Sequence, residues 1–383
     1  MYTLMNKNTP LIDFHWEGIE GVAIVPVVDK VYSQPWFISN LRDWLERRSV
    51  TKHREHMREL LTRLGLTDTK SIIDFSKGLS LTDTLWVNVD DKFQWDKVNL
   101  FQNEFDEVIE RIAFDGGMYG QHFSTTSPEF GTNGTYAKCW HRESDGVYLY
   151  KQGSTGAANA GYEIYSEMYA SDLLDALGYP HARYDLIRYR GKLVSRCKLF
   201  TSEQEMLLPL ATMVERELGG LQFGFIDVIE LCKKHYWAEQ LAEYLITDAL
   251  ILNEDRHLGN IGVICDADTF KVKRLSPIYD NGVSFCCFYR KHLESADLVG
   301  YAKTRTPSLY PDFIRGALAV AGREQIKKLE GLASFKFRTD SKYALEPERV
   351  RQLEQIVQIQ AEKLLTGDGG SAQQPNAFGR LNS

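Results

Sequence analysis

Apolar residues recur at intervals of three and four positions in three N-terminal segments, residues 35–49, 51–66 and 102–114. This spacing is typical of amphipathic α-helices, because it places the apolar side chains on one face. We therefore predict a helical region over residues 1–120. The apolar, turn-rich segment 78–91 has no period that assigns it to a helix or a strand.

The pattern changes about one third of the way along the chain, where short strands become prominent. Residues 146–151 have strand propensity and end at Lys151, and a loop of small residues follows. Helical spacing over residues 162–178 predicts a helix that ends at Gly178. Residues 182–200 predict two strands joined by a tight Arg-Gly turn.

Helical spacing dominates from residue 201 onwards. Residues 237–253 are strongly helical, and residues 261–277 predict a β-hairpin before helical patterns return. The last residues are rich in Gly, Ser and Gln, which predicts a disordered tail. The predicted organisation is an accessory region at 1–120, a small β-rich part at 121–200, a helical part at 201–366 and a tail at 367–383.

Composition restricts the class of protein. The 383 residues are 43% hydrophobic and 25% charged, as in ordinary soluble globular proteins. The net charge of −7 argues against nucleic acid or an anionic membrane as the main partner. The chain has no run of the ~18 apolar residues that cross a membrane and begins without an apolar signal core, so we expect a cytoplasmic protein. The six cysteines form no CxxC pair and the histidines lack zinc-ligand spacing, so we expect reduced thiols and no structural zinc.

A cluster of polar residues follows the apolar helix predicted at 237–253. Asp255, Arg256, His257 and Asn260 lie within six positions. Buried polar groups need partners, so such a cluster is either a satisfied structural network or a working site. Arg256 is better explained as a brace of this loop than as a ligand. His257 has two readings, a core imidazole that orients the loop or a donor near a transferred phosphate, and the sequence does not separate them.

Asp255, Asn260 and Asp280 have the spacing that phosphoryl transfer needs. Asp255 precedes Asn260 by five positions, and Asp280 follows twenty positions later, across the predicted hairpin. One carboxylate can orient or deprotonate an acceptor hydroxyl, while an Asn and a second Asp hold the Mg²⁺ that bridges nucleotide phosphates. Protein kinases use the same residue types in the same order, and "DNG" here takes the place of their "DFG".

Residues upstream supply the other parts of a nucleotide site in the expected order. Gly131 and Gly134 flank Thr132 and Asn133 just ahead of a strand. Such a small, flexible turn lets backbone N–H groups approach phosphates. Lys151 ends the following strand, from which its charge could reach the same phosphates.

Two acids, Glu163 and Glu167, lie on the next predicted helix and share the face that carries Leu174 and Leu177. An acid on a core-facing stripe needs a cation, and Lys151 is the obvious candidate. The pattern does not decide which acid is used, and we favour Glu163, the more N-terminal.

Each of these residues alone has an ordinary structural explanation. Lys151 could be a solvated strand end, Glu163 and Glu167 an exposed helix edge, Asp255 a helix cap, and Asp280 part of a common turn. Their occurrence together, in one order and with the spacing described, favours phosphoryl transfer over coincidence.

The motifs "NEDRHLGN" and "PIYDNG" resemble those of the HipA-like kinases, and the likeness covers roughly residues 75 to 290. The resemblance implies an α+β, bilobal protein-kinase-like fold with a small β-rich N-lobe and a mainly helical C-lobe, preceded here by the helical accessory region. It also implies an enzyme, an ATP- and Mg²⁺-dependent kinase that phosphorylates serine or threonine of a protein substrate. By position, Asp255 would be the catalytic base beside His257, and Asn260 and Asp280 would be metal ligands.

The resemblance also implies the residues that hold ATP. Lys151 would bind the phosphates and pair with Glu163. The strand "SRCKLF" would contact adenine through its backbone, near Ser195 and Cys197. The loop that covers the phosphates would consist of Gly131, Thr132, Asn133, Gly134 and Thr135.

Two features depart from the family pattern. HipA toxins usually carry an autophosphorylated serine in the phosphate loop, whereas this loop reads "FGTNGT" and offers only Thr132 or Thr135. Roughly the first 70 residues do not resemble the usual N-terminal module of members that pair with an antitoxin. A toxin role and a HipB-like antitoxin partner thus rest on the family alone, and we expect no direct contact with nucleic acid or membrane.

Two alternatives stay open at this point. Lipid or small-molecule kinases of the phosphatidylinositol kinase class share a motif very like "DRHLGNI", but they would be expected to carry a basic stretch after Asp280. The bases that follow Asp280 are dispersed. A nucleotide-binding pseudokinase is the second alternative, and the presence of every catalytic residue type argues against it.

Overall fold

The computed structural model describes residues 1–19, 23–49, 56–116, 127–132, 135–156, 161–219, 223–291, 294–338 and 342–367. The chain forms two compact units. Unit 1 comprises Met1–Gln152, Arg196–Leu207 and Ile264–Lys273, and unit 2 comprises Gly153–Ser195, Leu208–Val263 and Arg274–Ser383. The four-part organisation expected from the sequence stays a proposal, and the predicted tail falls outside the described residues from residue 368 onwards.

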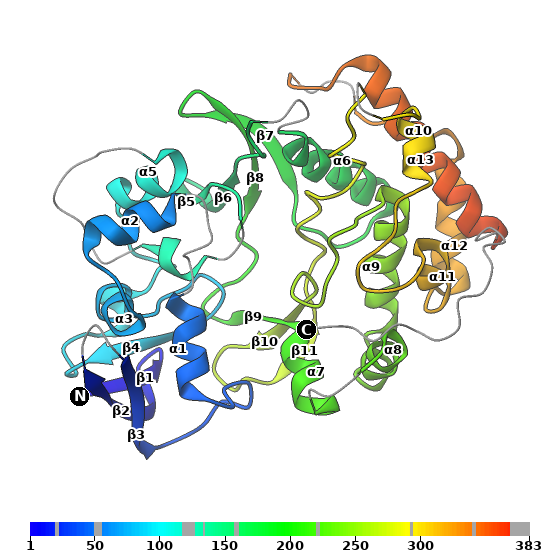
Figure 1. Cartoon of the computed structure of the whole chain (residues 1–383). Coiled ribbons are helices and arrows are strands. Elements are labelled where there is room, and N and C mark those ends of the chain that lie inside the picture. Colours follow the sequence, from blue (N-terminus) through cyan, green and yellow to red (C-terminus); the bar gives the residue numbers. More distant parts are fainter. Residues whose placement is uncertain are drawn as a thin grey trace. The chain divides into compact units, whose positions relative to one another are not determined.

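The N-terminal part of unit 1 contains an antiparallel sheet with the order β3-β2-β1-β4 (Figure 1). Leu4, Phe14 and Val87 are buried in the core between this sheet and helix α1, together with Leu45. The prediction of a purely helical region was therefore incomplete, because β1 and β4 stabilise each other across 79 to 87 positions of sequence (Asn6 with Leu85, Tyr2 with Val89). The strands are β1 (Tyr2–Asn6), β2 (Thr9–Ile19), β3 (Ala23–Val31) and β4 (Leu85–Val89).

The three helices predicted in this region are confirmed as α1, α2 and α5. The apolar face of α2 packs against that of α5, where Leu60, Ile109 and Ile112 are fully buried. Asp106 caps α5, since its side chain accepts hydrogen bonds from the backbone N–H groups of the first turn. The helices of unit 1 are α1 (Leu41–Ser49), α2 (Met57–Leu64), α3 (Thr69–Ser76), α4 (Trp95–Val98), α5 (Glu107–Asp115) and the 3₁₀ turn η1 (Pro128–Gly131).

Two further sheets contain the strands predicted in the middle of the chain. One has the order β5-β6-β8-β7 and the other the order β11-β10-β9. The predicted Arg-Gly turn joins β7 to β8, with Arg190 and Gly191 both at positive φ (49° and 79°). The strands are β5 (Lys138–Glu143), β6 (Gly146–Lys151), β7 (Tyr184–Tyr189), β8 (Lys192–Lys198), β9 (Glu205–Pro209), β10 (Gly262–Asp266) and β11 (Val272–Leu275).

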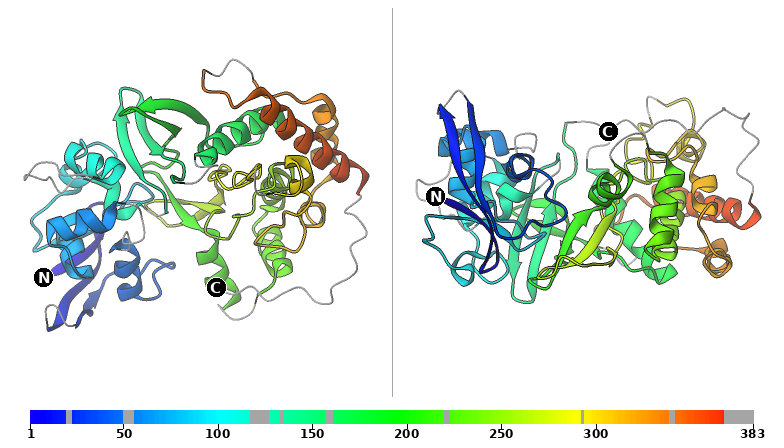
Figure 2. Two further views of the ribbon diagram at one scale, coloured as in Figure 1. Left: turned by 45° about the horizontal axis from the view of Figure 1, so that its top comes forward. Right: turned by 90° about the horizontal axis from the view of Figure 1, so that it is seen from below.

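Unit 2 is mainly helical, and Figure 2 shows its helices from two further directions. Helix α9 is apolar on nearly all sides, so it is buried in the unit and packs against α11 and α13. Among the described residues, no helix is both long and apolar enough to cross a membrane. The helices are α6 (Tyr162–Leu177), α7 (Leu210–Leu218), α8 (Phe225–Lys234), α9 (Ala238–Ile251), α10 (Leu298–Ala302), α11 (Phe313–Leu318), α12 (Arg323–Lys328), the 3₁₀ turn η2 (Leu329–Ser334) and α13 (Pro347–Thr366).

Candidate active site

The polar cluster after α9 begins with a sharp reversal of the chain. Leu252 adopts the left-handed conformation (φ 55°), which ends the helix. The backbone N–H of Asn253 then donates to the carbonyl oxygen of Asp248 (3.0 Å). The side-chain oxygen of Asn253 accepts a hydrogen bond from the N–H of Asp255 (3.1 Å), which forms an Asx turn. These bonds place Asp255 in a defined loop directly after a buried helix.

The guanidinium of Arg256 connects this loop to the loop that carries Asp280. Arg256 is completely buried, and its Nε donates to both carboxylate oxygens of Asp248 on α9 (3.1 and 3.2 Å). Its Nη1 donates to the carbonyl oxygens of Asn260 and Tyr279 (2.9 Å each), and its Nη2 donates to Oδ1 of Asn281 (2.6 Å). A planar, multiply bonded Arg is well suited to hold two loops in register. The structure therefore shows Arg256 as the brace that the sequence favoured.

Burial raises the pKa of Asp248 to about 6, and the positive charge of Arg256 opposes this rise. Sequence reasoning did not identify Asp248 as part of the cluster. The available signal was an acid in the last two turns of α9, which are otherwise apolar apart from Thr247, because a buried carboxylate requires a partner.

Asp255 and Asp280 are electrostatic neighbours. Partial burial raises the pKa of Asp255 above its ordinary value of 3.8, and the negative charge of Asp280 raises it further. The charges of His257 and Arg256 act in the opposite direction. Asp280 has a left-handed backbone (φ 58°), and its N–H donates to the hydroxyl of Tyr184 (3.4 Å). The structure thus brings together the two carboxylates whose spacing predicted phosphoryl transfer.

Asn260 lies in the same loop and is half-buried. Its Nδ2 donates to the carbonyl oxygen of Asp255 (3.2 Å). This bond orients the side-chain amide and leaves Oδ1 without a hydrogen bond to any described residue. An amide oxygen and the carboxylate of Asp280 are hard donors, of the type that Mg²⁺ prefers.

The two buried acids of α6 have different surroundings. Oε2 of Glu167 accepts a hydrogen bond from the N–H of Asn281 (2.9 Å), so this carboxylate supports the turn after Asp280. Oε2 of Glu163 accepts from the N–H of Ser154 (3.2 Å), whereas its Oε1 is buried and has no hydrogen-bond partner in the part of the chain that the structure describes.

An unsatisfied buried carboxylate oxygen calls for a cation. This difference between the two acids supports the choice of Glu163 as the partner of a lysine. Lys151 ends β6 in unit 1, whereas Glu163 belongs to unit 2, so their pairing stays a prediction.

His257 is exposed, so the reading of this residue as a core imidazole is wrong. Its Nδ1 accepts a hydrogen bond from the N–H of Gly259 (3.0 Å). A Cβ atom at position 259 would lie 2.7 Å from Cε1 of the ring, so a larger residue there would displace the imidazole from this position. In the neutral ring the proton is then on Nε2, which makes that nitrogen a hydrogen-bond donor.

The predicted phosphate loop is only partly described, because Asn133 and Gly134 lie outside the described residues. The hydroxyl of Thr132 donates to the carbonyl oxygen of Pro128 (2.8 Å) and accepts from Nε1 of Trp140 (2.9 Å), so it is held in the fold. A Cβ atom on Gly131 would lie 2.7 Å from the carbonyl oxygen of Leu79. Gly131 is thus needed for close packing, whatever its role toward a phosphate.

The other residues of the predicted nucleotide site have these positions. Thr135 is exposed. Ser195 and Cys197 lie on β8 with buried side chains, so only their backbone groups could contact a base. Their assignment to an adenine site stays a prediction.

Comparison with known proteins finds similarity to kinases in sequence and to solved structures in fold. No protein-family model matches the chain. The serine/threonine-protein kinase CtkA of Helicobacter pylori strain J99 is 30% identical over 135 residues, which cover 33% of this chain and 40% of CtkA. A chain from the Shewanella oneidensis MR-1 toxin–antitoxin complex of HipA, HipB and operator DNA aligns with a TM-score of 0.53 and 11% identity, covering 96% of this chain and 98% of that chain.

The crystal structure of the proinflammatory kinase CtkA of Helicobacter pylori aligns with a TM-score of 0.46 and 16% identity, over 61% of this chain and 90% of that chain. The alignment with the HipA complex confirms the predicted kinase-like fold class. The sequence match to CtkA and this fold together confirm the resemblance to the HipA-like kinases.

Proposed function

We propose that this chain, which resembles the HipA-like kinases in sequence and fold, transfers the γ-phosphoryl group of ATP to serine or threonine side chains of a protein in the cytoplasm, with Mg²⁺ as cofactor. The observation that carries the proposal is the Arg256 network. Its hydrogen bonds hold the loop of Asp255 and Asn260 against the loop of Asp280. The buried Arg256 thereby holds close together the side chains of Asp255, Asn260 and Asp280, which phosphoryl transfer needs.

The residues present fit Mg²⁺ and ATP. Oδ1 of Asn260 and the carboxylate of Asp280 would hold the metal, and Lys151, paired with Glu163, would hold the nucleotide phosphates. When bound, Mg²⁺ and ATP supply the transferable phosphoryl group and neutralise part of its charge.

Asp255 would orient the acceptor hydroxyl and take its proton. Its pKa, raised by desolvation and by the charge of Asp280, makes it a stronger base than an ordinary aspartate. Nε2–H of His257 would donate a hydrogen bond toward the transferred group. Glu167 would act indirectly, by fixing the backbone next to Asp280.

The titration of Asp255 is the first prediction. Since partial burial and Asp280 raise its pKa, Asp255 is expected to take up a proton above pH 3.8, and catalysis should fall as the pH decreases through this raised pKa. Carboxyl ¹³C NMR of protein labelled at Asp measures this, with the signal assigned by its loss in Asp255→Asn. In Asp280→Asn the Asp255 pKa should decrease. A pKa at or below 3.8, or one unchanged in Asp280→Asn, would contradict the arrangement.

The two glutamates of α6 provide a matched comparison. Glu163→Gln removes the charge that we assign to pairing with Lys151 and is expected to lower kcat/KM for ATP about tenfold or more. Glu167→Gln keeps an oxygen that can accept the N–H of Asn281, so its effect should be several times smaller. Steady-state kinetics with varied ATP gives both values. A larger loss of kcat/KM in Glu167→Gln than in Glu163→Gln would show that Glu167 is the partner of the lysine.

The acceptor class is tested with γ-labelled ATP and Mg²⁺, offered in parallel to a mixture of cytoplasmic proteins and to vesicles that contain phosphatidylinositol. The proposal predicts label on serine or threonine of protein. Label confined to the lipid would establish the lipid-kinase alternative. Failure of the protein to bind nucleotide in calorimetry, with and without Mg²⁺, would indicate a protein that has lost the function.

An antitoxin-type partner is the remaining part of the proposal, and its support is the fold shared with a chain of a toxin–antitoxin complex. Expression of the chain alone is then expected to slow growth, whereas expression of Asp255→Asn at the same level should not. Equal growth with the two chains would remove the toxin role and leave the kinase assignment intact.

A further inference from the structure

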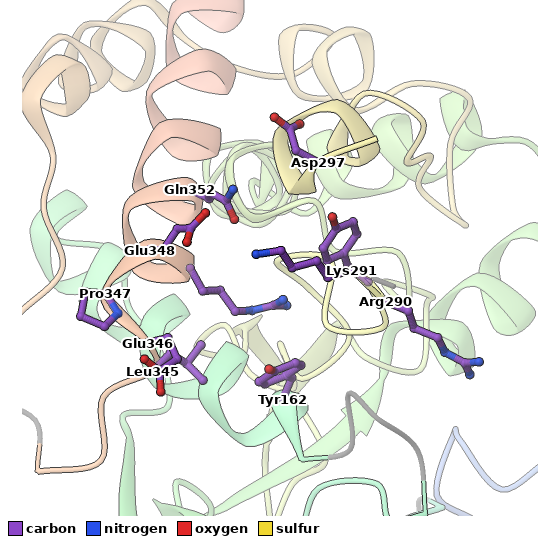
Figure 3. Close-up of a pocket in the computed structure, with 11 residues that line it drawn as sticks. Tyr162, Arg290, Lys291, Asp297, Leu345, Glu346, Pro347, Glu348 and Gln352 are labelled. Carbon is purple, nitrogen blue, oxygen red and sulfur yellow. The ribbon is translucent and has the colours of Figure 1, made fainter. Parts of the chain in front are cut away.

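A pocket of about 520 Å³ lies in unit 2, and none of its lining residues is assigned to phosphoryl transfer (Figure 3). Three segments form it: the start of α6, the segment after Asp280, and the start of α13. Its lining is Tyr162, Tyr289, Arg290, Lys291, Asp297, Leu345, Glu346, Pro347, Glu348, Arg349 and Gln352.

Arg349 is the central cation of this pocket. Its guanidinium carbon lies 4.1 Å from the centre of the Tyr162 ring, and its Nη2 donates to the carbonyl oxygen of Cys286 (3.2 Å). Its Nε is buried without a hydrogen-bond partner, and no described carboxylate forms an ion pair with it. Burial lowers the pKa of Arg349 below its ordinary value. A partly buried guanidinium whose buried Nε has no partner is costly unless an anion completes it.

Lys291 adds a second charge that points into the pocket, whereas the neighbouring Arg290 points away from it (Figure 3). Lys291 forms no ion pair with any described residue. The first turn of α13 also lies at the pocket, and its N-cap residue, Glu346, makes no side-chain capping bond. The positive end of this 20-residue helix therefore adds to the field of the two cations.

Three acids line the same pocket and oppose this field. The carboxylate of Asp297 is engaged, because its Oδ1 accepts from the N–H of Gly300 (2.7 Å) at the start of α10. Glu346 and Glu348 lie beside the first turn of α13. A ligand that binds here must offer enough negative charge and enough acceptors to outweigh these two carboxylates.

We propose that this pocket is a binding site for a phosphoryl group, carried either by a phosphorylated protein side chain or by a small phosphate. A phosphate dianion has three acceptor oxygens, so it can accept from the free guanidinium N–H groups of Arg349 and from the ammonium of Lys291 at once. A carboxylate carries half the charge and fewer acceptors. The site does not rest on the proposed phosphoryl transfer, because none of its residues takes part in that reaction.

The test is a calorimetric titration of the full chain with three probes: inorganic phosphate, a phosphoserine peptide and the same peptide without phosphate. The Asp255→Asn background prevents turnover and separates this test from that of kinase activity. With the pocket residues unchanged, this protein should bind inorganic phosphate and the phosphopeptide, but not the peptide without phosphate. Tighter binding of the phosphopeptide indicates a protein-borne group, and equal or tighter binding of inorganic phosphate indicates a small phosphate.

Variants locate the binding. Lys291→Met and Arg349→Met should each weaken it about tenfold or more, since each removes a charge-assisted contact. Arg290→Met is the matched control, because it removes a neighbouring charge that points away and should change affinity less than about twofold. Glu348→Gln should tighten binding. Lys291 is exposed, so its variant remains informative if Arg349→Met fails to fold. Unchanged affinity in Lys291→Met, or no binding of either phosphate-bearing probe, would overturn the proposal.

Discussion

Replacing Asp255 by Asn is expected to lower the rate of phosphoryl transfer by roughly 10³-fold, because general-base catalysis contributes about 10²- to 10⁴-fold. Asparagine has the same shape, and the Asp255 side chain makes no hydrogen bond of its own among the described residues, so the fold should be unaffected. The affinity for nucleotide should also be preserved, since Asn260 and Asp280 remain. Transfer rates with labelled ATP and calorimetric nucleotide binding give the two quantities separately.

Asp268→Asn provides the control for this variant. Asp268 is an exposed aspartate in the turn between β10 and β11, where its carboxylate forms an ion pair with Lys7 (2.6 Å). The same change of charge at this position should leave the transfer rate within about twofold, because such an exposed pair contributes little to stability. A full transfer rate in Asp255→Asn, with Asp268→Asn equally active, would show that Asp255 is not the base.

The second large effect is expected on stability. Arg256→Met should lower the free energy of unfolding by roughly 3–5 kcal/mol, the range for removing one partner of a buried ion pair. The loss has two parts. The buried carboxylate of Asp248 is left without its partner, and the carbonyl groups of Asn260 and Tyr279 lose their donor. Urea unfolding at neutral pH measures the change. Lys7→Met, which breaks an exposed pair, should cost less than about 1 kcal/mol.

A double variant separates the two parts of this loss. Asp248→Leu combined with Arg256→Met removes both charges of this buried pair. The double variant should therefore regain much of the stability that Arg256→Met alone loses. Catalysis should stay low in the double variant, because the loops of Asp255 and Asp280 are still without their common brace. Recovery of both stability and activity would mean that Arg256 serves the fold alone. A single variant as stable as Lys7→Met would contradict the role of the buried pair.

Local periodicity was sufficient to predict the elements whose partners are near in sequence. Helices α6 and α9 and the hairpin of β10 and β11 were predicted because each carries its own apolar pattern and turn residues. The N-terminal sheet was missed for the opposite reason. β1 is short, and although β2 follows it directly, its other edge pairs with β4, which lies outside any local window of sequence (Asn6 opposite Leu85).

The candidate site shows the same limit. The order and spacing of Asp255, Asn260 and Asp280 were visible in the sequence, because loops that follow a helix and a hairpin recur at fixed separations. The different surroundings of Glu163 and Glu167 were not visible in the sequence. They depend on the hydrogen bond between Glu167 and Asn281, which lie 114 positions apart. Gly131 was predicted for its flexibility, yet the structure requires it for packing against Leu79. Residue type thus indicated the chemistry, whereas three-dimensional contacts assigned the supporting roles.

The most direct test of the central claim uses purified protein, ATP labelled with ¹⁸O in the γ-phosphoryl group, Mg²⁺ and a dephosphorylated cytoplasmic protein extract. Mass spectrometry then identifies phosphorylated residues that carry the heavy label, for the wild-type chain and for Asp255→Asn. Our account predicts labelled phosphoserine or phosphothreonine with the wild-type chain and almost none with the variant. Absence of labelled protein with the wild-type chain, or equal labelling by the two, would contradict it.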